Sequence, residues 1–185
     1  EAKQKSKPIN IIYFSNMLKE KGYDIVLDLA TNMQSNSNYH FYFSGKFFDV
    51  TLENEFKHRI STMGNVTYFN GVYGEEKEQL LKKMHFILPT SYKDETLPIS
   101  MLEAMANALY IIVSDVGVIS EVVNKETTTL LPTIKVDTPL EIQHIIEATI
   151  DSIQDKNFKI VDLKYNFSND LIQKRIFGIL EGINF

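Results

Sequence analysis

The run FILPTSYKDETLPISMLEAMA occupies residues 86–106 and is the stretch that decides the fold. It opens with an apolar segment at residues 86–88, which is typical of a short buried strand. Pro98 follows a polar loop, and proline suits the first turn of a helix, where its missing N–H is no loss. The run therefore predicts a strand, a loop and a helix, which is the repeating unit of a parallel α/β sheet.

Two glutamates lie around the start of this predicted helix. Glu95 falls in the loop before it, and Glu103 lies about one and a half turns inside it. A helix N-terminus presents free N–H groups and a partial positive charge, which together suit a phosphate. Carboxylates on either side can accept hydrogen bonds from the hydroxyls of a sugar or a ribose. The arrangement predicts a nucleotide-sugar site.

The rest of the chain repeats the same alternation of short apolar runs and longer amphipathic segments. We therefore expect an α/β fold, a Rossmann-like, doubly wound parallel sheet of six strands with helices on both faces. Strands are predicted at residues 10–14, 40–44, 66–69, 86–88, 110–113 and 128–131. Helices are predicted at residues 22–32, 52–63, 75–84, 98–107, 119–123, 139–152 and 168–183.

Composition narrows the function further. A chain of 185 residues is long enough for one well-buried domain and short for two. The net charge of −5 argues against a nucleic-acid partner. The sequence has no cysteine, and its four histidines show no metal-ligand spacing, so the composition gives no sign of a metal or another cofactor. No apolar run approaches the roughly 20 residues that span a bilayer, and a cytoplasmic location fits this composition.

The stretch around the two glutamates resembles one large family, the retaining glycosyltransferases of family four, which have the two-domain GT-B fold. The resemblance is carried by Ile87-Leu88-Pro89-Thr90-Ser91, Glu95-Thr96-Leu97-Pro98, Leu102-Glu103-Ala104-Met105-Ala106, Ile111-Ile112-Val113-Ser114-Asp115-Val116-Gly117 and Glu121. It extends from about residue 9 to residue 181 and covers only the family's C-terminal, donor-binding half. Many members build bacterial lipopolysaccharide, capsule and other exopolysaccharides.

This chain departs from the family pattern at two turns. The family commonly has Gly-x-Pro before the next strand, where this chain has Ala108-Leu109-Tyr110. It often has Gly-Gly-x-Pro-Glu where this chain has Gly117-Val118-Ile119-Ser120-Glu121. Both changes affect packing and turn geometry more than charge.

The resemblance also implies roles at the end of the first predicted strand. In the family an arginine and a lysine there hold the donor's pyrophosphate, and Lys21-Gly22 matches the lysine and its glycine. Asn16 stands where the arginine usually is, and Ser15 replaces a glycine. Asn16 donates hydrogen bonds but brings no charge, so phosphate binding would depend more on Lys21. Gly71 matches a family glycine beside the nucleotide base, although a glycine there equally suits a tight turn.

Around the predicted helix, the resemblance implies that Glu103 binds the ribose hydroxyls and that Glu95 contacts the transferred sugar. Glu95 could stabilise developing positive charge at the anomeric carbon or orient the sugar hydroxyls, and we favour orientation. Glu95 and Lys21 are therefore the candidate catalytic residues. The candidate donor-binding residues are Asn16, Lys21, Gly71, Glu95, Thr96, Leu97, Pro98 and Glu103.

Taken together, these features predict a donor-binding domain at residues 9–185, preceded by a linker at residues 1–8 from an absent N-terminal acceptor domain. The expected reaction is transfer of a sugar from a nucleotide-sugar donor to a saccharide or lipid-linked acceptor, without a metal. We expect this chain alone to be inactive. We expect a cytoplasmic location, and any peripheral association with the inner face of the membrane would come through the missing half.

Two other functions stay open. The first is a non-catalytic nucleotide-sugar-binding module, which Asn16 and the absent half favour mildly. The second is a GT-B nucleotide-sugar epimerase, which the pair Glu95 and Glu103 and the Glu-Ala-Met-Ala run disfavour.

Overall fold

The structure is a computed structural model that describes residues 8–92, 98–123, 127–131 and 137–155, the last four by their backbone alone. Its six strands form one sheet in which every neighbouring pair is parallel. The strands are β1 (Ile9–Phe14), β2 (Tyr39–Ser44), β3 (Val66–Phe69), β4 (Phe86–Ile87), β5 (Tyr110–Ser114) and β6 (Thr128–Leu131). The predicted α/β class and the six-stranded, doubly wound parallel sheet are confirmed.

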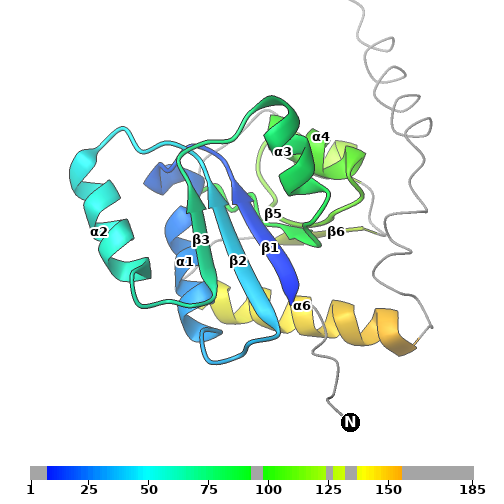
Figure 1. Cartoon of the computed structure of the whole chain (residues 1–185). Coiled ribbons are helices and arrows are strands. Elements are labelled where there is room, and N and C mark those ends of the chain that lie inside the picture. Colours follow the sequence, from blue (N-terminus) through cyan, green and yellow to red (C-terminus); the bar gives the residue numbers. More distant parts are fainter. Residues whose placement is uncertain (1–7, 93–97, 124–126, 132–136, 156–185) are drawn as a thin grey trace, which may run out of the picture.

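The strand order is β3-β2-β1-β4-β5-β6, so the chain builds the sheet outward in both directions from its middle (Figure 1). β1 pairs with β2 on one side and with β4 on the other: Ile11 lies opposite Phe41 and also opposite Phe86. The direction of winding reverses between β1 and β4. In such sheets ligands bind at the carboxyl ends of the strands beside this reversal.

Helices connect the strands close to the predicted positions. They are α1 (Tyr23–Asn32), α2 (Val50–Ile60), α3 (Gly74–Leu81), α4 (Ile99–Ala106), α5 (Ile119–Val122) and α6 (Thr138–Asp155). A 3₁₀ turn at Lys19–Lys21, which the sequence did not predict, leads into α1. The predicted helix at residues 168–183 lies outside the described residues.

The two faces of the sheet are covered by different helices because successive strand residues point to opposite sides. Ile11 and Tyr13 of β1 belong to a core shared with α1, α2 and α6. Ile12 belongs to a second core, shared with α3, α4 and α5. Figure 1 shows α1 and α6 on one side of the strands and α3 and α4 on the other.

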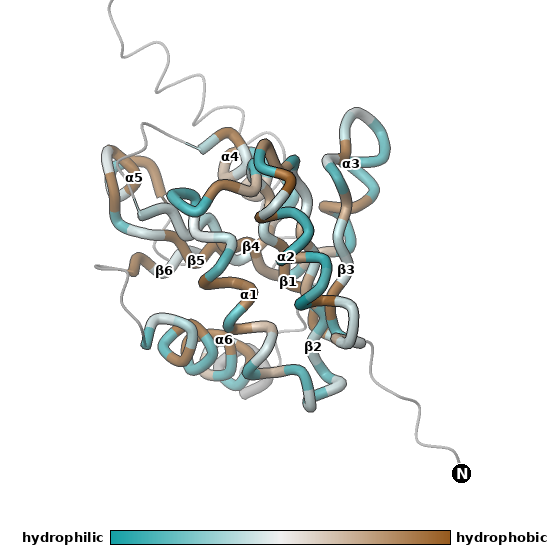
Figure 2. The backbone as a smooth tube through the Cα atoms, turned by 90° about the vertical axis from the view of Figure 1, so that its left-hand side faces the viewer, coloured by the Kyte–Doolittle hydropathy of each residue, from teal (hydrophilic) through white to brown (hydrophobic). Residues whose placement is uncertain are grey.

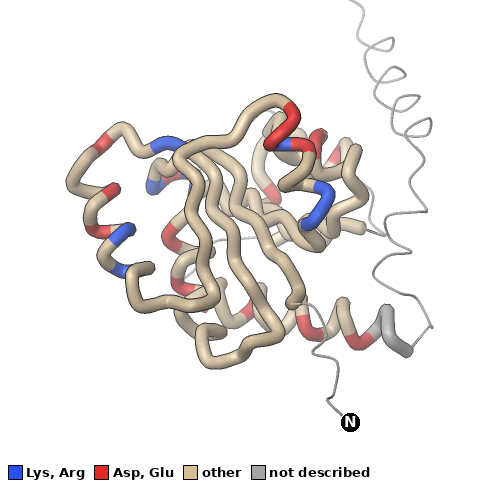
Figure 3. Tube along the Cα trace, in the orientation of Figure 1, with Lys and Arg blue, Asp and Glu red and all other residues tan. Residues whose placement is uncertain are grey.

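Charge and hydropathy follow this layering. The six strands contain no Lys, Arg, Asp or Glu, and the charged residues lie on helices and loops (Figure 3). α2 is mostly hydrophilic along its length (Figure 2) and buries only Phe56. The strands therefore supply an apolar framework, and the charged groups available for chemistry lie on the helices and loops around it.

The end of α4 shows the structural setting of Ala108, where the resembled family has glycine. Ala108 has φ of +54°, the left-handed conformation that alanine adopts only with strain. The Ala108 N–H donates to the Met105 carbonyl, and the Leu109 N–H donates to the Ala104 carbonyl. This is the double hydrogen bond of a helix C-terminus whose next residue is usually glycine. Ala108 holds the place of that glycine.

We therefore expect Ala108→Gly to stabilise the protein by about 1 kcal/mol, because glycine removes the left-handed strain at a smaller cost in unfolded-state entropy. Urea unfolding followed by circular dichroism measures the change. Ala106→Gly is the matched control: Ala106 lies exposed within α4, where glycine should cost about 0.5–1 kcal/mol. If both variants were destabilised equally, the strain assigned to Ala108 would be absent.

Candidate functional site

A cleft of about 540 Å³ opens at the carboxyl ends of β1, β2 and β4, beside the reversal in strand order. Its walls come from these strand ends, the loop after β3 and the start of α4. The lining residues are Phe14, Ser15, Asn16, Lys21, Ser44, Gly45, Gly71, Val72, Tyr73, Pro89, Ser91, Pro98, Ile99, Ser100 and Glu103. Several hydroxyls, one lysine and one carboxylate are set among apolar surface, which is the usual lining of a small-molecule site.

Lys21 reaches the cleft because its turn is tied to the loop after β4. The Thr90 hydroxyl donates to the Gly22 carbonyl at 2.8 Å, and the Ser91 hydroxyl donates to the Glu20 carbonyl at 3.1 Å. Gly22 has φ of +73°, and a Cβ added to it would lie 1.9 Å from the Thr90 carbonyl oxygen. Only glycine fits here. The residue after Lys21 must therefore be glycine, because the backbone of the loop after β4 leaves no room for a Cβ.

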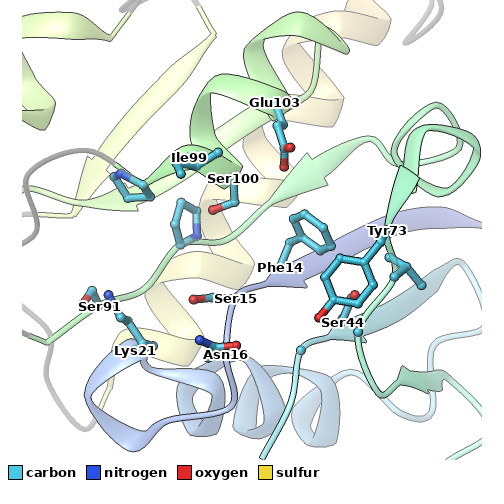
Figure 4. Close-up of a pocket in the computed structure, with 15 residues that line it drawn as sticks. Phe14, Ser15, Asn16, Lys21, Ser44, Tyr73, Ser91, Ile99, Ser100 and Glu103 are labelled. Atoms are coloured by element: carbon cyan, nitrogen blue, oxygen red, sulfur yellow. The ribbon is translucent and has the colours of Figure 1, made fainter. Parts of the chain in front are cut away.

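The Asn16 segment is held in a similar way. The Tyr13 hydroxyl donates to the Asn16 carbonyl at 2.9 Å, and burial raises the pKa of Tyr13 well above its usual range, which keeps this donor protonated. A Cβ on Gly45 would lie 1.8 Å from the Ser15 carbonyl oxygen. The loops after β1 and β2 therefore touch through their main chains, and the Asn16 side chain faces the cleft (Figure 4).

On the opposite wall, α4 carries Glu103. The sequence predicted Pro98 inside the first turn, but the helix begins one residue later: Pro98 is the N-cap, and its carbonyl accepts from the Met101 N–H at 2.9 Å. Figure 4 shows the Glu103 carboxylate directed toward the cleft. Its Oε1 lies 2.5 Å from Nζ of Lys77 on α3. The sequence analysis did not anticipate this partner.

The loop after β3 supplies the rim. Gly71 has φ of +81°, and its N–H donates to the Phe69 carbonyl at 2.7 Å, so it does form a tight turn. It also lines the cleft, and its place beside a nucleotide base stays a prediction. Tyr73, two residues on, is 66% exposed, and Lys46 Nζ lies 5.7 Å from the centre of its ring.

Of the predicted donor-binding residues, the structure brings five into this one cleft: Asn16, Lys21, Gly71, Pro98 and Glu103. The remaining predictions, Glu95, Thr96 and Leu97, lie outside the described residues. Sequence reasoning missed the hydroxyls of Ser44, Ser91 and Ser100 as lining groups. Their signal was weak because each is a small residue next to a strand end or at a helix start, positions that serine often takes.

Within residues 8–92, 98–123, 127–131 and 137–155, no three His, Asp or Glu side chains come together as a metal site would require. Among the helices of those same segments, none has the length and apolarity to cross a bilayer.

The cleft lies at the carboxyl ends of the strands beside the reversal in strand order, where parallel α/β sheets bind ligands. The profile described as "Glycosyl transferases group 1" matches residues 1–161. The chain belongs to this family. No match was found among curated proteins.

Solved structures share the fold of this group 1 family member. HepE of Anabaena, solved in complex with UDP, is 18% identical with a TM-score of 0.68 over 96% of this chain and 50% of HepE. The C-terminal domain of LpcC from Francisella tularensis, a group 1 glycosyl transferase, is 18% identical with a TM-score of 0.67, over 86% of this chain and 85% of that domain. WaaG, a glycosyltransferase involved in lipopolysaccharide biosynthesis, is 16% identical with a TM-score of 0.61, over 75% of this chain and 38% of WaaG.

At sequence identities of 16–18%, the similarity to these structures establishes the fold alone. The chain spans about half the length of HepE and less of WaaG, while it corresponds to most of the LpcC domain.

Proposed function

We propose that this chain is the donor-binding domain of a retaining, family-four type glycosyltransferase. The observation that carries the proposal is the convergence of Lys21, Asn16 and Glu103 in one cleft at the sheet's switch point. In Figure 4 Lys21 and Asn16 lie toward one end of the cleft and Glu103 toward another. A nucleotide has the matching polarity, with an anionic diphosphate at one end and a ribose diol nearer the base.

Each side chain then has a chemical task. Lys21 neutralises the diphosphate as it leaves the sugar, and Asn16 donates a hydrogen bond to it. Glu103 accepts from the ribose hydroxyls, and the rim at Gly71 receives the base. Glu95 is assigned to orienting the transferred sugar, and the Thr96 and Leu97 N–H groups are assigned to binding the phosphates. The cleft contains a lysine and a helix start to oppose the phosphate charge, so the proposed transfer uses no metal.

The wider activity is proposed on the family and its neighbours. HepE was solved with UDP and with UDP-glucose, which supports a nucleotide-sugar donor here. WaaG acts in lipopolysaccharide biosynthesis, which supports a saccharide or lipid-linked acceptor and a role in bacterial surface polysaccharide synthesis at the cytoplasmic face of the membrane. Residues 1–8 would link this domain to an acceptor-binding half, and transfer would need both halves because positioning supplies much of the rate.

A thermal-shift screen with UDP, GDP, ADP and their sugar conjugates tests the proposal. At about one hundred times its Kd, a ligand stabilises the folded state by about 2.7 kcal/mol, which should raise Tm by about 5–10 °C. Free uridine, guanosine and adenosine are the matched controls, because they lack the diphosphate that Lys21 and Asn16 bind. A panel without any diphosphate-dependent shift would contradict a donor site.

The second candidate, a non-catalytic nucleotide-sugar-binding module, is favoured by one feature: Asn16, which lines the cleft where we propose that the phosphates bind, carries no positive charge. The two functions differ when the chain is joined to an acceptor-binding half. Sugar transfer by the joined protein supports the enzyme, and binding without transfer supports the module.

A further inference from the structure

We propose that Lys77 is a positioning residue that holds the Glu103 carboxylate ready for the ribose diol. The inference rests on the proposed function and deepens it, because it assigns the recognition of ribose to an ion pair rather than to a single acid.

The ion pair joins two walls of the cleft. Lys77 lies on α3, which follows the rim loop of Gly71 and Tyr73, and Glu103 lies on α4. Leu80 and Leu81 of α3 share a core with Met101 and Ala104 of α4, so the two helices pack on the same face of the sheet. The Lys77 and Glu103 side chains are 29% and 26% exposed, and this partial burial shields their contact from solvent screening.

The contact leaves Glu103 able to bind a ligand. A carboxylate has two oxygens and about four acceptor positions, and Lys77 is bonded to Oε1. Oε2 and the second lone pair of Oε1 remain for two neighbouring hydroxyls. A side chain that is already held also loses less conformational freedom when the ligand arrives.

Charge gives a second reason for the pair. A bare carboxylate in the same cleft would repel the diphosphate that Lys21 and Asn16 are proposed to bind. Lys77 offsets that negative charge without occupying the cleft, since it is not among the lining residues. The acid can thus serve as an acceptor beside an anionic ligand.

The test compares UDP with 2′,3′-dideoxy-UDP by calorimetric titration. The two ligands carry the same charge, so the ratio of their Kd values isolates ribose recognition from general effects of charge or stability. We expect the wild-type chain to prefer UDP by about ten- to a hundredfold. Lys77→Met should reduce this preference by about two- to tenfold, the cost of ordering a free Glu103 side chain. Lys77→Arg should retain most of it.

A double variant and a control complete the experiment. Lys77→Met combined with Glu103→Gln should show the same preference as Glu103→Gln alone, because Lys77 acts through Glu103. Lys57→Met breaks a comparable ion pair, Lys57 Nζ to Glu53 Oε1 at 2.7 Å, on α2 outside the cleft, and it should leave the preference unchanged.

The outcomes separate the inference from the function on which it rests. If Lys77→Met left the preference for UDP unchanged, the ion pair would serve only to stabilise the fold. If the preference increased, Lys77 would compete with the ribose for Glu103. Either result overturns the inference. Tight UDP binding by the wild type without preference over the dideoxy analogue would overturn it too, while the donor site stands. Failure to bind UDP, GDP and ADP alike would instead reject the proposed function.

Discussion

Replacing Gly22 with alanine should destabilise the protein by roughly 2–5 kcal/mol. The left-handed conformation at φ of +73° costs an alanine about 1–2 kcal/mol. The new Cβ would also meet the Thr90 carbonyl oxygen at 1.9 Å, and forcing extra atoms into a packed site costs about 1–3 kcal/mol more. Since small domains are stable by only about 5–15 kcal/mol, this is a large fraction of the total.

Substitutions at two other glycines separate the conformational cost from the cost of the steric contact. Gly74 has φ of +55° but no neighbour within 4 Å of an added Cβ, so Gly74→Ala should show the conformational cost alone. Gly64 also has no neighbour within 4 Å and lacks the positive φ, so Gly64→Ala should change stability by less than about 0.5 kcal/mol. Urea unfolding of the three variants measures the free energy of unfolding of each and so ranks the three substitutions. Equal effects for Gly22 and Gly74 would show that the Lys21 turn is not pressed against the loop after β4.

Glu103→Gln should weaken the binding of a nucleoside diphosphate by roughly ten- to a hundredfold. The glutamine keeps the size of the side chain but replaces a charged acceptor, and a hydrogen bond to a charged group contributes about 1.5–3 kcal/mol. Titration calorimetry with the diphosphate that gives the largest thermal shift measures the loss. Glu53→Gln is the matched control, because Glu53 has a lysine partner of its own on α2 and lies outside the cleft.

Glu95→Gln should behave differently. Glu95 is assigned to the transferred sugar, which a nucleoside diphosphate lacks, so binding of the diphosphate should stay nearly intact. In a protein that joins this chain to the proposed acceptor-binding half, the same substitution should lower turnover. If the two glutamine variants lost diphosphate affinity equally, or only Glu95→Gln lost it, the assigned roles would be wrong.

Much of the fold could be predicted because the strands are short, apolar and free of charge. β3 and β6 have the predicted bounds, and the other strands begin or end within one residue of them. The start of α2 was placed two residues late although its signal is present in the sequence: the Asp49 side chain accepts from the N–H groups of Thr51 and Leu52. The turn at Lys19–Lys21 had no comparable local signal. Hydrogen bonds to Ser91 and Tyr92, which lie far along the chain, hold it.

The candidate site, like the fold, could be predicted only in part from the sequence. Residues that follow a strand end, such as Asn16 and Gly71, could be placed at the cleft because a parallel sheet brings those ends to one edge. The partner of Glu103 could not be predicted, since Lys77 is 26 positions away on another helix. Their contact depends on how α3 and α4 pack, and the sequence next to Lys77 has no feature that marks it as the partner of Glu103. Tertiary packing, rather than sequence spacing, selects the pair.

The strand order also sets the sequence of events as the chain is synthesised. β1, β2 and β3 are neighbours in the sheet and follow one another along the chain, so they can pair as soon as they emerge. The other edge of β1 stays without its partner until β4 is made, on the order of ten seconds later at ordinary rates of translation. An open strand edge of this kind is prone to aggregate. Because the cleft takes walls from both halves of the sheet, it is incomplete in a nascent chain until β4 and α4 have joined it.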